Sequence, residues 1–256
     1  MKRAVIATCA AMATTAGLLV VVLGGASTAA AAPAIPQYIS AAVADSARPA
    51  EDKQRDAERK PADTLAFAGV KPGETVIEIA PGKGYYTRLL SAVVGAKGKV
   101  YAATSPPKPD APAPPVQAIA ADPHYSNVSV SFQRAADLKL PQGVDLVWTS
   151  LNYHDFHNIP DVDVGAINRA VFAALKPGGT YLVVDHAAEV GSGARDTNTL
   201  HRIDEETVKQ EVTAAGFKLV AESDVLRNKA DPHTAKVFDA EIKGHTDQFM
   251  LRFKKP

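Results

Sequence analysis

E-T-V-I-E-I-A-P-G-K-G-Y-Y-T, residues 74–87, is the stretch that decides the fold of this chain. Its apolar part, Val76, Ile77 and Ile79, is short and rich in β-branched residues, which is typical of a buried parallel strand. A turn with two glycines follows, and apolar residues at helical spacing begin at Tyr86. Because glycine has no Cβ, the backbone of such a turn can approach a nucleotide-like ligand closely. The alternative is a tight turn that binds nothing.

Further stretches carry the pattern of strands, and helices alternate with most of them. Amphipathic helices are expected over residues 161–175 and between Asp204 and Gly216. The alternation predicts an α/β fold with a doubly wound, Rossmann-like, seven-stranded and mostly parallel sheet. The last two strands have no helix between them, which predicts an antiparallel last strand. The expected strands after the first are 99–103, 127–132, 144–149, 180–184, 217–225 and 246–253.

The amino terminus has the pattern of a secretory signal peptide. Lys2 and Arg3 precede an Ala/Leu/Val run, and small residues continue to Ala32. Residues 1–32 are therefore expected to be removed, and the protein to be periplasmic or secreted, without stable membrane insertion. The alternative is an uncleaved anchor, because the apolar run approaches the ~20 residues that span a bilayer. Cleavage would also remove Cys9, the only cysteine, and leave no disulfide.

Composition indicates how the rest of the chain is divided into segments, and charge indicates which kind of partner it binds. Residues 33–62 are expected to form a tether and a helix, and residues 63–256 a single domain, for which 46% hydrophobic residues supply the core. Lys+Arg and Asp+Glu balance at 28 each, which argues against nucleic acid as a partner. The expected partner is a small molecule or an envelope component, and no oligomeric state is indicated.

Three motifs together carry a family resemblance. V-I-E-I-A-P-G-K-G-Y-Y-T, V-D-L-V-W-T at the fourth strand and L-K-P-G-G before the fifth resemble class I S-adenosylmethionine (SAM)-dependent methyltransferases, over about residues 65–256. The signal peptide, D-H at 185–186 and H-R-I-D at 201–204 resemble, more narrowly, secreted bacterial proteins described as predicted methyltransferases. The resemblance implies SAM as the cofactor and methyl transfer as the reaction.

The resemblance also implies which residues hold the cofactor. The glycine motif begins with an acidic residue, here Glu78, and the turn after it would hold the methionyl end of SAM. Two positions depart from the family: Thr104 replaces the acid that holds the ribose hydroxyls, and Arg134 replaces an Asp near the adenine. A charged hydrogen bond is worth about 1.5–3 kcal/mol, so SAM binding is expected to be weak. The predicted cofactor-binding residues are Glu78, Ala80, Pro81, Gly82, Gly84, Thr104, Arg134 and Ser150.

Candidate catalytic residues follow the fourth and fifth strands, because ligands of open α/β sheets bind at the carboxyl ends of the strands. His154 is predicted to be the base that removes the acceptor's proton, with Asp185 or His186 orienting it and His201 as a further candidate. The alternative is that His154 and His157 lie at a loop surface and that Asp185 caps a turn. No metal is predicted, because H-x-x-H in a loop does not fix the geometry of a site that would use His154, His157, Asp185 and His186.

Three functions remain in view. The first is a SAM-dependent methyltransferase acting on a small molecule or an envelope component. The second is an exported, non-catalytic ligand-binding module with a degenerate methyltransferase fold, which the compartment favours because SAM is made in the cytosol. The third, a nucleotide-dependent oxidoreductase, is disfavoured by Thr104 and by Thr87, which stands where a dinucleotide fingerprint has glycine. The long segment 187–202 is expected to be functional or mobile, with Gly191 and Gly193 as a hinge or an exposed loop.

Overall fold

The computed structural model describes Met1 and residues 34–256, and the structural statements below concern these residues. The predicted signal peptide and Cys9 lie outside them. Within the described part of the chain, no helix is both long enough and apolar enough to cross a membrane.

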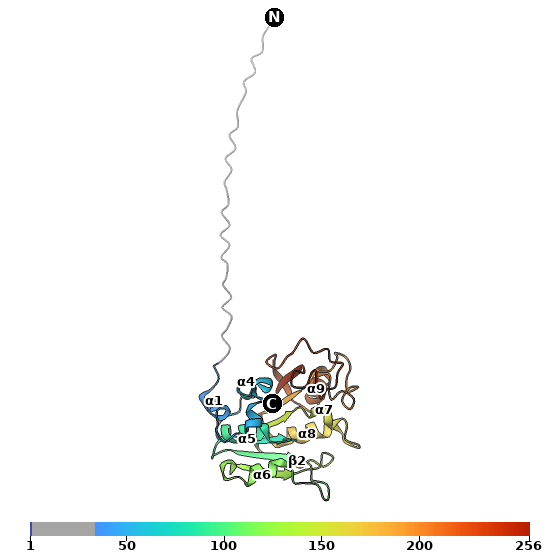
Figure 1. Cartoon of the computed structure of the whole chain (residues 1–256). Coiled ribbons are helices and arrows are strands. Elements are labelled where there is room, and N and C mark those ends of the chain that lie inside the picture. Colours follow the sequence, from blue (N-terminus) through green and yellow to red (C-terminus); the bar gives the residue numbers. More distant parts are fainter. Residues whose placement is uncertain (2–33) are drawn as a thin grey trace. The chain divides into compact units, whose positions relative to one another are not determined.

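One mixed sheet of seven strands organises the domain (Figure 1). The strands are β1 (Thr75–Ile79), β2 (Lys99–Thr104), β3 (Val128–Phe132), β4 (Val144–Ser150), β5 (Leu175–His186), β6 (Lys218–Ser223) and β7 (Gln248–Lys254). Their order across the sheet is β3-β2-β1-β4-β5-β7-β6. The pairs from β3 to β5 are parallel, and β7 is antiparallel to both β5 and β6. The predicted sheet and its antiparallel last strand are confirmed.

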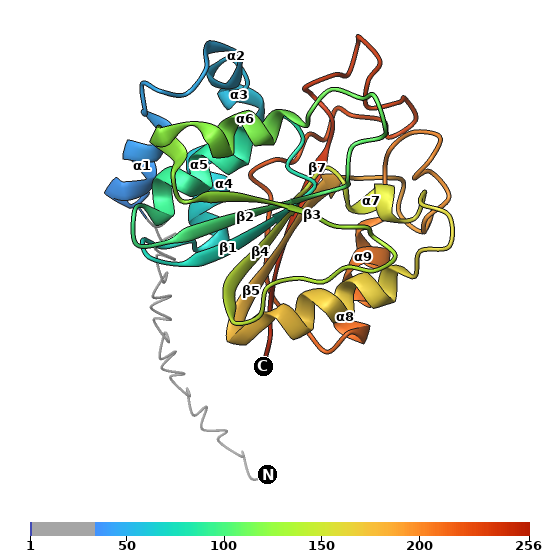
Figure 2. The same cartoon turned by 90° about the horizontal axis from the view of Figure 1, so that it is seen from below.

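Helices cover both faces of this sheet, as Figure 2 shows. α1, α4, α5 and α6 lie over one face, and α8 and α9 lie over the other. The helices are α1 (Gln37–Val43), α2 (Ala50–Lys53), α3 (Asp56–Arg59), α4 (Pro61–Ala68), α5 (Tyr85–Val94), α6 (Pro115–Ala121), the 3-10 helix η1 (Pro123–Tyr125), α7 (Tyr153–Phe156), α8 (Val164–Ala174) and α9 (Glu205–Ala214).

Alternation along the strands explains the two-faced core. Val76 packs with the cluster under α5, and its neighbour Ile77 packs with the cluster under α8. Successive side chains of a strand point to opposite faces, so a run of apolar residues serves both layers. Trp148 is fully buried in the first cluster and Tyr181 in the second. The β-branched run of β1 is therefore typical of a central strand, because helices cover both faces of the sheet and side chains on both faces of β1 are buried.

The predicted tether is wrong over residues 37–43. These residues form α1, which places Ile39 and Ala42 in the same core as α5. The small residues of this segment hide a helical spacing that buries only two side chains. The helical segment is interrupted next to Pro61: α3 ends at Arg59, and Pro61 occupies the first turn of α4, where its missing N–H costs nothing.

Two boundaries near the site also differ from expectation. The segment expected as a loop after β4 contains the short helix α7. α8 begins three residues later than predicted, at Val164, because the Asp163 side chain caps it by accepting the Gly165 N–H at 2.8 Å. β5 begins at Leu175, and its pairing with β4 shifts register across the expected K-P-G-G turn.

The chain order reverses at β1. β2 and β3 extend the sheet on one side of β1, and β4 and β5 extend it on the other. A crevice forms outside the carboxyl ends of strands at such a reversal. The ends of β1 and β4, at Ala80 and Leu151, are therefore where a ligand is expected.

Candidate functional site

The turn after β1 has a left-handed backbone at three positions. The φ angles are 53° at Ala80, 56° at Gly82 and 80° at Gly84. The two glycines serve different purposes: a Cβ on Gly84 would lie 2.0 Å from the Cδ1 of Ile119, whereas a Cβ on Gly82 would meet nothing within 4 Å. Gly84 thus permits helix packing, and Gly82 leaves open space. Ala80 keeps a side chain where this backbone costs about 1–2 kcal/mol.

Glu78 lies beneath this turn and is 3% exposed. The Thr87 hydroxyl donates a hydrogen bond to its Oε2 at 2.5 Å. Burial raises the pKa of Glu78 to about 7, although the Thr87 hydrogen bond and the charges of Arg59 and Arg88 act in the opposite direction. The carboxyl therefore changes charge near neutral pH. Thr87, which the sequence marked only as a missing glycine, is its direct partner.

Three adjoining hollows run along the carboxyl edge of the sheet. The apolar pocket, about 210 Å³, is lined mainly by Ile79, Ala103, Ala135, Leu138, Phe156 and Ile167. The turn pocket, about 510 Å³, is lined by Glu78, Pro81, Gly82, Tyr85, Tyr86 and Ser150, among others. The histidine pocket, about 650 Å³, includes His154, His186, His201, Phe238, Thr246 and Gln248.

Shared residues join these hollows into one cleft. Ala80, Thr104 and Asn152 line both the apolar and the turn pockets. Leu151 lines both the turn and the histidine pockets, and Asp155 lines all three. A ligand of nucleoside size can therefore extend along the edge of the sheet toward the histidines.

The end of β4 is tied to the end of β1 by Asn152. Its Nδ2 donates to the carbonyls of Ile79 and Ala80 at 3.2 Å each. The preceding residue, Leu151, has a φ of 59° and is, after Ala80, a second left-handed position at the cleft that is not a glycine.

Ser150 has an unpartnered polar atom at the cleft. Its Oγ is buried and has no hydrogen-bond partner among the described residues, and the residue lines the turn pocket. A buried hydroxyl without a partner costs about 1–3 kcal/mol. A polar ligand in the turn pocket would remove that cost.

Of the two positions that depart from the family, Thr104 lines the cleft and Arg134 does not. Thr104 lines both the apolar and the turn pockets. Arg134 is exposed, pairs with Asp137 in a short bridge, and lines none of the three pockets. Its neighbours Gln133 and Ala135 line the apolar pocket instead. Gln133 thus places a side-chain amide at this edge, although its Nε2 already donates to the Ser131 hydroxyl at 2.8 Å and its Oε1 accepts the Lys139 N–H at 3.0 Å.

His154 is held rigidly by Asp185. The backbone N–H of His154 donates to Asp185 Oδ2 at 2.8 Å, and its Nδ1 lies 2.8 Å from Asp185 Oδ1. Nε2 lies 3.3 Å from Asp155 Oδ1. Burial disfavours the charged ring, but the Asp185 and Asp155 carboxylates prevail and raise the pKa of His154 to about 10. A ring that already carries its proton does not act as a base, so these contacts do not fit the predicted role.

His186 and His157, two further candidates, lie in different places. His186 lines the histidine pocket, with its Nδ1 2.7 Å from Thr246 Oγ1, and burial lowers the pKa of His186 to about 4 despite the charge of Asp185. It is therefore neutral. His157 points elsewhere, with its Nε2 3.3 Å from Glu211. The H-x-x-H pair does not converge.

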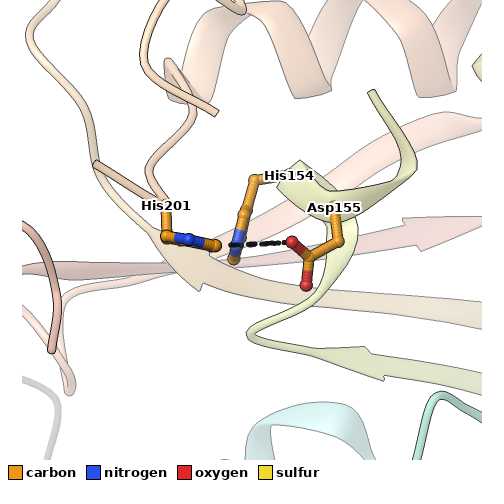
Figure 3. Close-up of side chains that lie close together, drawn as sticks. All are labelled: His154, Asp155 and His201. Atoms are coloured by element: carbon orange, nitrogen blue, oxygen red, sulfur yellow. Dashed lines mark ion pairs between the residues drawn. The ribbon is translucent and has the colours of Figure 1, made fainter. Parts of the chain in front are cut away.

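His201 is the histidine that does meet His154. Their ring centroids are 5.4 Å apart with the rings nearly perpendicular, and His201 Nδ1 lies 3.6 Å from Asp155 Oδ1. Figure 3 shows the three side chains, from α7 and the loop before α9, directed toward one another. Asp155 follows His154 directly in the sequence, and its position after the fourth strand places it at this edge of the sheet without indicating a role.

The loop that carries His201 is fixed at both ends. The Asp204 carboxylate accepts the Gly191 N–H at 3.0 Å and the Gly193 N–H at 3.5 Å. Arg202 is fully buried and makes a two-pronged ion pair with Asp231, at 2.8 and 3.0 Å. The segment expected to be functional or mobile is thus held in place where it meets the cleft.

No family model matches the sequence, and no curated protein matches it either. Solved structures do. A SAM-dependent methyltransferase from Aquifex aeolicus superposes with a TM-score of 0.59 at 20% identity, covering 82% of this chain and 99% of that one. A SAM-dependent methyltransferase from Mesorhizobium loti gives 0.55 at 17% identity, covering 78% and 99%.

The cyclase SpnF superposes equally well, with a TM-score of 0.57 at 19% identity, covering 81% of each chain. At such identities the likeness shows the fold alone, which is that of SAM-dependent methyltransferases. Because a cyclase shares it, the reaction has to be argued from the cleft.

Proposed function

We propose that this chain binds SAM in the turn and apolar pockets and transfers its methyl group to a small molecule or an envelope component in the histidine pocket. The observation that carries the proposal is the single cleft. Asp155 lines all three of its hollows, so a cofactor and an acceptor bound there meet at one residue.

The residues present fit the cofactor. An adenine ring suits the apolar pocket, where Ile79 and Leu138 offer apolar contact and Gln133 an amide. The open backbone at Gly82 and the unpartnered Ser150 hydroxyl suit the polar methionyl end. SAM, when bound, supplies an electrophilic methyl group on a positively charged sulfur.

The chain's own contribution is mostly positioning. Methyl transfer is a displacement in which alignment of the reacting atoms supplies much of the rate. Asn152 fixes the ends of β1 and β4 relative to each other, and Asp185 fixes His154. The protonated His154 and the neutral His186 give the histidine pocket a polar wall without an obvious general base.

The exported binding module is the second candidate. It is favoured by the carboxyl ends of β2 and β3, where Thr104 and the exposed Arg134 offer no acidic acceptor to the ribose or the adenine. Such a module would bind a nucleoside-like ligand in the same cleft without transferring a methyl group.

Calorimetric titration with SAM and with S-adenosylhomocysteine tests the proposal. We expect micromolar or weaker binding, about −8 kcal/mol or less favourable. Gly82→Val should abolish it, because its side chain enters the space left for the ligand. The control is Gly143→Val, before β4: its φ of 76° imposes a similar backbone strain, and a Cβ there also meets nothing within 4 Å.

Loss of binding in Gly82→Val alone supports the site. A folded wild-type protein that takes up neither ligand at millimolar concentration would rule out the methyltransferase. Binding of both ligands with no methyl transfer to any acceptor tried would favour the binding module.

Export is proposed as well, on the signal-peptide pattern of residues 1–32. Amino-terminal sequencing of the protein from its native host should begin between about residues 30 and 36. A protein recovered from the cytosol with Met1 in place would contradict export and restore an ordinary supply of SAM.

A further inference from the structure

We propose that His154, Asp155 and His201 bind a divalent transition-metal ion, with zinc as the reference ion. Each of the three side chains offers one donor atom, and these atoms all lie within 4.8 Å of one another. Metal binding stands on these residues alone. The role suggested for the ion below rests on the proposed methyl transfer.

The distances between donor atoms suit a metal ion. Two ligands at the usual 2.0–2.2 Å from a tetrahedral zinc lie about 3.4 Å apart. Asp155 Oδ1 is 3.3 Å from His154 Nε2 and 3.6 Å from His201 Nδ1. The third separation, between the two imidazoles, lies within 4.8 Å, so metal binding would require the His201 side chain, which is 31% exposed, to turn slightly toward His154.

Asp185 leaves the correct nitrogen of His154 available. A histidine that binds a metal usually donates its other ring N–H to a carboxylate, which fixes the ring. His154 meets this condition, because its Nδ1 lies 2.8 Å from Asp185 Oδ1 and its Nε2 faces the cluster. Asp185 also accepts the backbone N–H groups of His154 and His186, at 2.8 and 2.7 Å, so it is itself immobile.

His201 is placed by the residue that follows it. Arg202 is buried against Asp231 and also donates to the carbonyls of Ala187 and Ala235 at 3.0 Å each. His201 itself has a φ of 56°, a conformation that costs a residue other than glycine about 1–2 kcal/mol. Strain of this kind is tolerated where the surrounding structure imposes it, and it gathers at functional sites.

The charge of the cluster also favours a dication. Asp155 and Asp185 flank His154, and around a neutral imidazole they carry a net charge of about −2. Within the described part of the chain, neither carboxylate forms an ion pair with a lysine or arginine. Of the four lysines and arginines that line the pocket, Arg55 and Arg59 pair with Glu58 instead. A divalent ion would replace the proton on Nε2 and neutralise the pair.

An ion at this place could also activate the methyl acceptor. Three protein ligands leave a coordination position for an acceptor hydroxyl or thiol, whose proton then passes to solvent water. The oxyanion or thiolate forms a bond to the methyl carbon of SAM as the bond from that carbon to sulfur breaks. The electron pair remains on sulfur, which leaves neutral S-adenosylhomocysteine.

The test is titration of the full chain with Co²⁺ and Zn²⁺ after treatment with a chelator. We expect one ion per chain and, with Co²⁺, visible absorption bands typical of nitrogen and oxygen ligands. His201→Gln should weaken binding at least as much as loss of an outer partner does, by about 10- to 100-fold or more. This variant changes a half-buried loop residue, so the fold should survive.

His157→Gln is the matched control, because His157 also pairs with a carboxylate but lies outside the cluster. It should bind the ion like the wild type, and Asp155→Asn should bind it weakly, like His201→Gln. The proposal is overturned if the wild type takes up no ion, or if His201→Gln and His157→Gln behave alike. A protein that binds S-adenosylhomocysteine but no ion would refute this metal site and leave the proposed methyltransferase intact. A protein that binds an ion but neither SAM nor S-adenosylhomocysteine would support the metal site and refute the methyltransferase.

Discussion

The turn after β1 takes its residues from one short run, Glu78 to Thr87, whereas the histidine pocket collects side chains from α7, the end of β5, the loop before α9 and the segment before β7. The turn is held mainly by local backbone geometry and by the contact between Thr87 and Glu78, with Asn152 as its link to the end of β4. The pocket is held by ion pairs between residues far apart in the sequence. A change in the turn should therefore act locally, and a change behind the pocket should act on the whole domain.

The largest effect is expected from Arg202→Ala, behind the histidine pocket. It leaves Asp231 buried without its partner, which typically costs about 3–5 kcal/mol. Urea denaturation measures the loss. Arg195→Ala is the control, because Arg195 pairs with Asp196 in the same loop but is exposed, and it should change little. Equal effects of the two variants would show that the loop is not held by the buried pair.

The second largest effect is expected when the stabilities of variants at the two glycines of the turn are compared. Gly84→Ala should be less stable than Gly82→Ala by about 1–3 kcal/mol, because only the first forces a methyl group against Ile119. Both variants share a left-handed backbone, so their difference isolates the packing. Thermal or urea denaturation of the two variants gives the value. If Ile119→Ala did not restore part of the loss, the collision would not be its cause.

Glu78→Gln tests the turn through the dependence of stability on pH. Because the pKa of Glu78 is raised to about 7 in the folded protein, the stability that this carboxyl contributes is fully present below about pH 4.5 and is lost as the pH rises through 7. The variant lacks this loss, so at pH 8 it should exceed the wild type by up to about 3 kcal/mol. At pH 4.5 the two should be alike. Denaturation at both pH values decides it.

The exposed Glu241→Gln serves as the control for that experiment and should show no such dependence on pH. If the stability advantage of Glu78→Gln were the same at both pH values, the buried carboxyl would not titrate in this range.

The smallest effect is expected at Ala80. Ala80→Gly relieves about 1–2 kcal/mol of backbone strain but increases the freedom of the unfolded chain by about 0.4–1 kcal/mol. The net gain should therefore be about 0.5 kcal/mol, measured by urea denaturation. A loss of stability would show that the Ala80 methyl group makes a contact worth more than the strain.

Much of the fold could be predicted because its signals are local. The β-branched run of β1, the glycines after it and the Asp204 cap each specify their structure within a few residues. α1 was missed because small residues give a weak apolar pattern, and α7 because one helical turn is too short to show a period. Both errors concern elements that tertiary contacts stabilise.

In the candidate site, too, some contacts could be predicted from the sequence and others depend on tertiary structure. His154, Asp185 and His186 could be brought together in advance, because β4 and β5 are neighbours whose carboxyl ends share an edge. The meeting of His154 with His201 could not, since it depends on a loop conformation set by Arg202 and Asp231. Arg134 lies outside the cleft because the chain turns back toward Asp137 directly after β3.

Asp155 touches every part of the cleft, and this has a thermodynamic consequence. Two ligands that share a residue are linked, and the factor by which one changes the affinity of the other is the same in both directions. A dication held by Asp155 repels the sulfonium of SAM but not the neutral sulfur of S-adenosylhomocysteine. If both proposals hold, the ion would be bound less tightly while SAM is present and more tightly once the methyl group has left.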